Sequence, residues 1–227
     1  MTAHIQQLIR VDQPTGFQVI LDQIAAILAV ESANQQRLAE EAHLNPSFWK
    51  LRVFKERSNP WEGARDQDCD SFAVPVINVA LDNMSYDGMA ASETNLQRCT
   101  GVYNIDCYGF GVSVDTDEGH DPGDEEAAKE AHRAFRLVRE MLMSGYYKYL
   151  RLRGLVGKRS IQSVTEFQPV IDSRPIQRVV GIRVGLAVDF IETSQQFEGE
   201  AMDLLSVSVI QAPDGEILFN ADFPLRG

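Results

Sequence analysis

The spacing of hydrophobic residues predicts two long helices. Over residues 15–42, apolar residues recur at three- and four-residue steps and therefore share one helix face: Phe17, Ile20, Leu21, Ile24, Ile27 and Leu28. Pro14 and Thr15 suit the start of this helix. The second helix covers residues 121–150, with its own apolar stripe of Ala131, Phe135, Val138, Leu142 and Tyr149. Asp121 suits its N-cap and Gly154 its C-terminal stop.

Alternation of apolar and polar residues predicts strands elsewhere. The predicted strands are 49–55, 72–81, 102–112, 161–170 and 179–191, followed by a C-terminal hairpin of 204–210 and 216–219. In the strand 102–112, Gly109 and Gly111 lie two apart and so on one face, where another backbone can approach closely. The strand 179–191 carries one continuous apolar face: Val180, Ile182, Val184, Leu186, Val188 and Phe190.

The order of these elements predicts an α+β fold. Strands come in runs rather than alternating strictly with helices, which favours a mixed, mostly antiparallel sheet with the two long helices packed on one face. The C-terminal hairpin is added to this layer. We expect a single domain over residues 1–227, with a core of about 15–192 and a C-terminal extension of 193–227.

Composition narrows the function classes. With 227 residues, 44% hydrophobic content and a net charge of −12, the chain can bury a core but is not a globally basic nucleic-acid binder. No apolar run approaches a membrane span, and the first residues lack the pattern of a secretory signal, so we expect neither. Three cysteines without CxxC spacing (Cys69, Cys99 and Cys107) favour reduced, intracellular thiols over a disulfide framework or a closed zinc site.

Three segments invite a chemical interpretation. Residues 115–126 are acidic, but glycine occupies the fifth position rather than the sixth that a calcium loop needs, which favours a solvated linker before the helix. Residues 154–160 lack the spacing of a phosphate loop. Asp66, Asp68 and Asp70, near Trp61, are the carboxylates on which a metal-dependent hydrolase would depend. Because they fall in a predicted loop, we expect no enzyme activity, no catalytic residues, no cofactor and no metal ion.

Charged residues gather at the two ends of the second predicted helix. The basic group is Lys148, Arg151, Arg153, Lys158 and Arg159, and the acidic group includes Asp115, Asp117 and Glu118. These eight residues form the candidate interface, because opposite charges on neighbouring copies attract. The simpler interpretation is that the charges serve the helix dipole alone.

The overall pattern resembles the tail-terminator, or neck, proteins of tailed bacteriophages. The resemblance spans roughly residues 15–192: a first helix and strands, a central strand at 102–111, a long amphipathic helix, and closing strands. It implies a structural virion protein that forms a ring, most often a homohexamer, in the tail or neck after assembly in the host cytoplasm. The ring would cap the tail tube, contact the sheath of a contractile tail, join the head–tail connector, and let DNA pass without binding it.

Three other classes stay open. The chain is alternatively another tail tube, tail-completion or baseplate component, since these use similar small α+β subunits. It is alternatively a cellular binding module with a protein partner. The third alternative is the metal-dependent hydrolase built on the 66–70 carboxylates.

Overall fold

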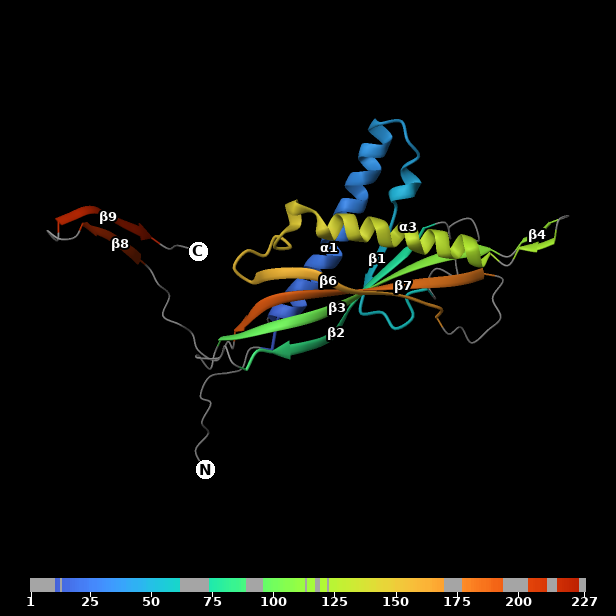
Figure 1. Cartoon of the computed structure of the whole chain (residues 1–227). Coiled ribbons are helices and arrows are strands. Elements are labelled where there is room, and N and C mark those ends of the chain that lie inside the picture. The colour runs from blue at the N-terminus through green and yellow to red at the C-terminus, as the bar shows by residue number, and fades with distance from the viewer. Residues whose placement is uncertain are drawn as a thin grey trace, which may run out of the picture. The chain divides into compact units, whose positions relative to one another are not determined.

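The computed structural model describes residues 11–12, 14–61, 74–88, 96–112, 114–116, 119–121, 123–169, 177–193, 204–211 and 216–224. It confirms an α+β protein with a mixed sheet of five strands and two long helices (Figure 1). The helices are α1 (Gly16–Glu41) and α3 (Asp124–Met143), with short 3₁₀ turns η1 (Pro46–Trp49) and η3 (Gly145–Tyr147). The strands are β1 (Arg52–Lys55), β2 (Val76–Tyr86), β3 (Leu96–Val112), β4 (Val114–Thr116), β5 (Gly119–Asp121), β6 (Val156–Phe167), β7 (Gln177–Thr193), β8 (Leu204–Gln211) and β9 (Glu216–Pro224).

The five-stranded sheet is built around one long antiparallel pair. Its order is β1-β2-β3-β7-β6, in which β1 pairs parallel with β2 and every other pair is antiparallel. Strands β3 and β7 are each 17 residues long and pair without a register break from Leu96–Thr193 to Val112–Gln177. This pair therefore sets the length of the layer on which the helices rest.

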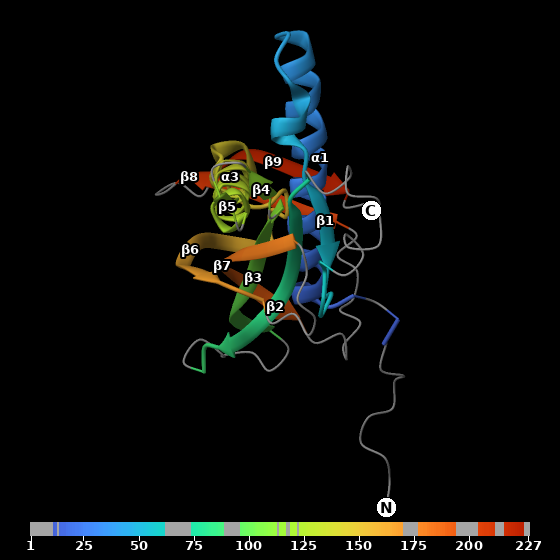
Figure 2. The ribbon, with the colours of Figure 1, turned by 90° about the vertical axis from the view of Figure 1, so that its right-hand side faces the viewer.

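Both long helices contribute to one core on the same face of the sheet (Figure 2). The apolar face predicted for residues 179–191 is buried in this core, and Val184 is 1% exposed. Its helical partners are fully buried residues of α1 and α3, among them Ile20, Ile24, Leu28, Ala131, Ala134 and Val138. The spacing of apolar residues therefore identifies the buried face of both helices and of β7.

Two glycines let α3 lie directly on β3. A Cβ atom at Gly109 would stand 2.1 Å from the carbonyl oxygen of Ala127, and one at Gly111 would stand 2.0 Å from that of Gly123. Neither distance is possible for a real side chain, so only glycine fits at these two places. The close backbone approach predicted from their spacing is confirmed.

The boundaries of α3 differ from the prediction. The helix begins after Gly123, an N-cap with φ of 72°, because Asp121 belongs to β5. It ends at Met143 rather than near residue 150, because the Ser144 side chain accepts a hydrogen bond from the Tyr146 amide and opens η3. Gly154 is therefore not the helix stop, and no basic residue lies in the last turn of α3.

Strand boundaries shift in the same way. Residues 82–86, which follow the predicted strand 72–81, continue β2 after a bulge between Leu81 and Asn83. The acidic segment predicted as a linker contains the antiparallel pair β4–β5. Residues 46–49 form η1, so that β1 begins only at Arg52.

Helix α1 is apolar enough to resemble a membrane span. Among the described helices it alone has the length and hydropathy to cross a bilayer. However, Ile20, Ile24 and Leu28 are fully buried against the sheet, which accounts for much of its apolar character. The side chain of Glu192 lies at its start and accepts a hydrogen bond from the Gly16 amide at 3.1 Å, so β7 supplies negative charge where the first turn of α1 has none.

The chain divides into a compact unit, Val11–Thr193, and a second unit that includes β8 and β9. These two strands form a separate antiparallel two-stranded sheet. Its register pairs Leu205 with Phe223, Val207 with Ala221 and Val209 with Phe219. Whether the whole chain is a single domain stays a prediction.

A charge on the core face of β7 should prevent folding. We expect Val184→Asp to lower the free energy of unfolding by about 3 kcal/mol or more, because it buries an unpaired carboxylate. The control is Val164→Asp, at the cross-strand partner of Val184 on β6, where the side chain is 49% exposed. Chemical denaturation of both variants measures the difference. Equal stabilities for the two would show that this face is not the core.

Candidate functional site

The structure places the predicted basic group in the segment that follows α3. Lys148, Arg151, Arg153 and Lys158 are exposed there, whereas Arg159 is half-buried. The Arg159 guanidinium donates hydrogen bonds to the carbonyl oxygens of Leu142 at 2.6 Å and Ser144 at 2.8 Å. Burial lowers the pKa of this guanidinium. Arg159 thus satisfies the open carbonyl groups at the end of α3, the role that the helix-dipole interpretation had given to the whole group.

Tyrosines are interleaved with the exposed cations. Arg151 donates a hydrogen bond to the Tyr146 hydroxyl at 2.7 Å and lies 4.9 Å and 5.2 Å from the ring centroids of Tyr146 and Tyr147. Lys148 lies 5.1 Å, and Arg153 6.0 Å, from the ring centroid of Tyr149. Cation–π contact orients these charges while leaving them exposed to solvent.

A hydrogen bond ties this segment to α1. The Tyr147 hydroxyl donates to Glu31 Oε1 at 2.5 Å. This bond is the main reason that the pKa of Glu31 lies below its usual value. Burial, together with the same bond, raises the pKa of Tyr147 to about 12. The end of α3 is therefore held to the middle of α1.

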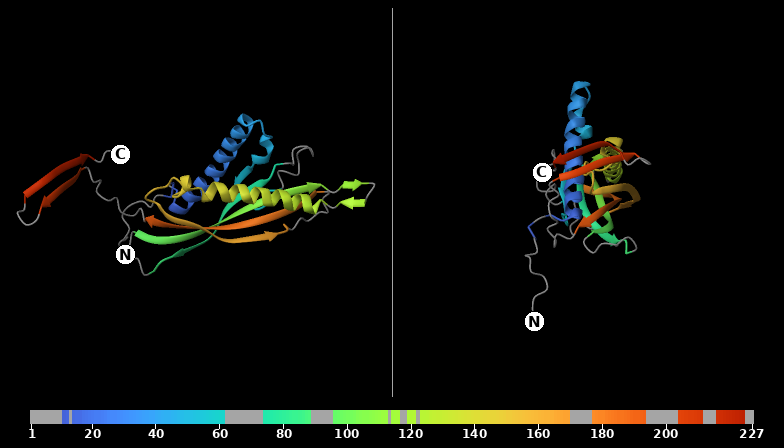
Figure 3. Two further views of the ribbon diagram at one scale, coloured as in Figure 1. Left: turned by 45° about the horizontal axis from the view of Figure 1, so that its top comes forward. Right: turned by 90° about the vertical axis from the view of Figure 1, so that its left-hand side faces the viewer.

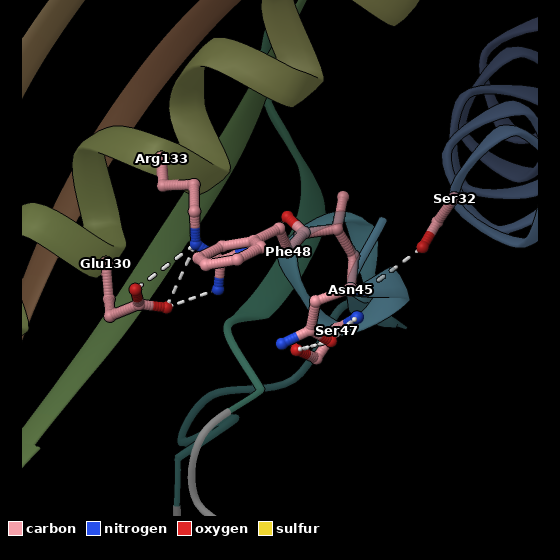
Figure 4. A network of polar contacts seen from close by, with 7 residues as sticks. Ser32, Asn45, Ser47, Phe48, Glu130 and Arg133 are labelled. Carbon is pink, nitrogen blue, oxygen red and sulfur yellow. Dashed lines mark hydrogen bonds and ion pairs between the residues drawn. The ribbon is translucent and has the colours of Figure 1, made fainter. Parts of the chain in front are cut away.

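Beyond this point, residues 31–49 form a projection that we call the wing: the second half of α1, a turn and η1 (Figure 2). Buried Ser32 fixes η1 to α1, since its hydroxyl donates to the Trp49 carbonyl at 2.8 Å and accepts from the Leu51 amide at 3.0 Å. Figure 4 shows the link to α3, where Arg133 donates to the Phe48 carbonyl and pairs with Glu130. The wing thus continues directly from the first half of α1 and is also bonded to α3.

An open groove of about 380 Å³ lies between the wing and the end of α3. Its apolar lining comes from η1, α3 and η3: Trp49, Leu137, Met141, Tyr146 and Tyr147. Charged side chains also line it, namely Glu31, Arg136 and Glu140. Of these, Glu31 accepts the Tyr147 bond and Glu140 pairs with Arg139 at 2.9 Å. Sequence reasoning missed this groove, although the tyrosines at 146, 147 and 149 were a visible signal.

Of the predicted acidic group, the structure describes the backbone of one residue, which precedes α3. Asp115 belongs to β4, where only the backbone is described, and Asp117 and Glu118 lie outside the described residues. Figure 3 shows β4–β5 extending past the start of α3. Exposed Asp124 and Glu125 add charge in the first turn, where Asp124 lies 3.6 Å from Arg178. A helix of 20 residues is about 30 Å long, so α3 places its first-turn carboxylates, Asp124 and Glu125, about that far from its last turn, after which the basic segment begins.

Two observations on the described residues concern catalytic and metal-binding interpretations. Within them no group of three His, Cys, Asp or Glu residues could hold a metal ion. Burial raises the pKa of the Cys99 and Cys107 thiols, the opposite of what a nucleophile requires. Asp66, Asp68 and Asp70 lie outside the described residues, so the hydrolase alternative is untested.

The arrangement of aromatic and charged side chains on the compact unit is suited to protein contact. One end of the compact unit offers an aromatic groove with exposed cations, and the other end offers carboxylates. Aromatic residues and arginine are enriched where proteins bind one another. No model of a known protein family and no curated protein matches the sequence.

Removing the Arg159 guanidinium should destabilise the fold. We expect Arg159→Ala to lower the free energy of unfolding by about 1–3 kcal/mol, because two carbonyl groups at the end of α3 lose a charged donor. Its exposed neighbour provides the control, and Lys158→Ala should change stability by less than about 0.5 kcal/mol. Urea denaturation separates the two. Equal effects would mean that Arg159 does not cap α3.

The Glu31–Tyr147 bond should appear as a pH dependence of stability. A carboxyl group whose folded pKa is depressed stabilises the fold above its unfolded pKa of 4.5, and loses this contribution as pH falls through the folded value. We expect Tyr147→Phe to cost about 1 kcal/mol near pH 7 and less near pH 4. Tyr149→Phe is the control, and denaturation at both pH values gives the result. A cost for Tyr147→Phe that does not change with pH would contradict this assignment.

Proposed function

We propose that the chain is a structural virion protein of a tailed bacteriophage, which forms a ring that caps the tail tube and joins the tail to the head–tail connector. The proposal rests on the resemblance of the whole pattern to tail-terminator proteins. The five-stranded mixed sheet with two long helices is consistent with it. The single observation that carries it is the separation of opposite charges at the two ends of α3.

This separation supports head-to-tail contact between copies. The cationic end carries Lys148, Arg151, Arg153 and Lys158. The acidic end carries Asp124 and Glu125 in the first turn of α3, which follows β4 and β5 in the chain. When one end of a copy meets the other end of the next, the interface is heterologous. Such an interface yields a ring if the rotation between copies closes, and a filament if it does not. We expect closure, most often with six copies.

A ring of this kind works without catalysis. By occupying the growing end of the tail tube it stops further polymerisation, and its opposite surface is available to the connector. A net charge of −12 on each copy disfavours adhesion of DNA passing through the centre. We propose that the C-terminal hairpin β8–β9 supplies contact beyond the charged ends, since charge pairs at a rim set register more than affinity.

Native mass spectrometry of the full chain tests the ring. We expect a closed oligomer at low salt that weakens as salt rises. Reversing two exposed cations, Arg151→Glu with Arg153→Glu, should abolish it. The control, Lys55→Glu with Arg57→Glu, makes the same change in net charge at exposed cations outside the segment and should leave it intact.

Two outcomes would contradict the proposal. A chain that stays monomeric both alone and with purified tail tubes does not form a ring. Open filaments would instead assign the chain to the tail tube, because the same type of interface has then failed to close.

A further inference from the structure

We propose that the groove between the wing and α3 binds the C-terminal hairpin β8–β9 of a second copy of this chain. The inference rests on the proposed ring, because the groove and the hairpin are the surfaces that would supply the affinity between its subunits. Charged ends alone set register. A stable ring therefore needs an apolar contact in addition, and the structure offers one candidate surface and one candidate segment.

The proposed receptor surface combines exposed hydrophobic residues with the groove. Of the eleven large hydrophobic residues that are exposed in the described part of the chain, three belong to the wing and two to the end of α3 and the turn after it: Leu38, Leu44 and Phe48, and Met143 and Tyr146. Tyr146 is 71% exposed although it lines the groove, and Phe48 is 54% exposed beside Trp49, with ring centroids 6.3 Å apart. Scattered exposed hydrophobic residues are ordinary, whereas an exposed aromatic side chain such as Tyr146 in the lining of a groove is typical of a binding surface.

The groove is also fixed before any partner arrives. Its wall on η1 is held by Ser32 and Arg133 through the carbonyls of Trp49 and Phe48. Its wall on η3 is held by the bonds from Tyr147 to Glu31 and from Arg151 to Tyr146. Tyrosine and tryptophan anchors on a rigid frame lose little entropy on binding. Such residues carry most of the energy in protein interfaces.

The occupant follows from the register of β8–β9. In the middle of the hairpin, the pairs Leu205–Phe223, Val207–Ala221 and Val209–Phe219 alternate with Ser206–Asp222 and Ser208–Asn220; Leu204–Pro224 precedes them, and Ile210–Ile217 follows after a bulge. Alternation of apolar and polar residues over these five pairs is the sequence pattern of a strand pair that is covered on one side. A two-stranded sheet is marginally stable alone in water. A hairpin of this sequence pattern therefore gains stability when another surface covers its apolar residues.

Charge favours the same pairing. Residues 204–224 contain three carboxylates and no lysine or arginine. The groove is lined by Arg136, and exposed Arg151 donates to the hydroxyl of Tyr146 in its lining. Its two carboxylates, Glu31 and Glu140, already have partners in Tyr147 and Arg139. An acidic, amphipathic hairpin thus complements the groove in both polarity and charge. Seated on the neighbouring copy, it reinforces the contact that closes the ring.

Site-specific photo-crosslinking of the full chain tests the inference. A benzophenone amino acid replaces Tyr146 in one variant and Tyr86, another exposed tyrosine, in the control. Isotope-labelled and unlabelled chains are mixed under the conditions in which the ring forms, and the crosslinked peptides are identified by mass spectrometry. We expect the Tyr146 variant to crosslink to residues 204–224 of a different copy, and the Tyr86 variant not to do so.

Other outcomes overturn the inference in distinguishable ways. Crosslinks from position 146 to residues 204–224 of the same copy would show that the hairpin covers its own groove. If the ring still assembles but position 146 crosslinks to another segment, or to nothing, the hairpin is not the occupant. The proposal that the chain forms a ring then stands. If no ring forms under any condition tested, both the proposed function and this inference are refuted. As a second measurement, Tyr146→Asp should weaken the ring at least tenfold in subunit affinity while Tyr86→Asp should not.

Discussion

The contact of α3 with β3 at Gly109 and Gly111 is the constraint on which the rest of the structure depends. At both glycines the helix backbone stands where a side chain would have to be, with distances of 2.1 and 2.0 Å from a hypothetical Cβ. At these two residues the helix backbone therefore contacts the backbone of the sheet directly, with no side chain between them. Ala127, Ala131 and Ala134 are fully buried in this contact region, and their small size serves the same close approach.

The positions of the proposed assembly surfaces follow from this contact. The first turns of α3 are fixed to the sheet, with acidic residues at that end of the helix. Turn η3 and the basic segment follow at its other end. There, Arg159 satisfies the last carbonyls of α3, and Tyr147 joins the segment to α1 through Glu31. The wing then rests on α3 through Arg133. The groove between them is thus a consequence of how α3 is placed and ended.

Much of this architecture is predictable from sequence, because periodicity reports burial. The apolar faces of α1, α3 and β7, and the glycine pair of β3, all follow from residue spacing. The end of α3 does not, since apolar residues continue to Tyr149 beyond the point where Ser144 and Gly145 stop the helix. The roles of Arg159, Glu31 and Ser32 also escape prediction, because each acts on a group brought near by tertiary packing: Leu142, Tyr147 and Trp49. Spacing along the chain carries no signal for such contacts.

The central claim, that copies of this chain close into a ring at the end of a tail tube, is tested most directly by negative-stain electron microscopy of the full chain mixed with purified tail tubes. The account predicts tubes that end in a discrete cap whose end-on view has cyclic symmetry, most often sixfold, and the absence of further tube growth past that cap. Tubes with bare ends that continue to polymerise in the presence of the protein would contradict it.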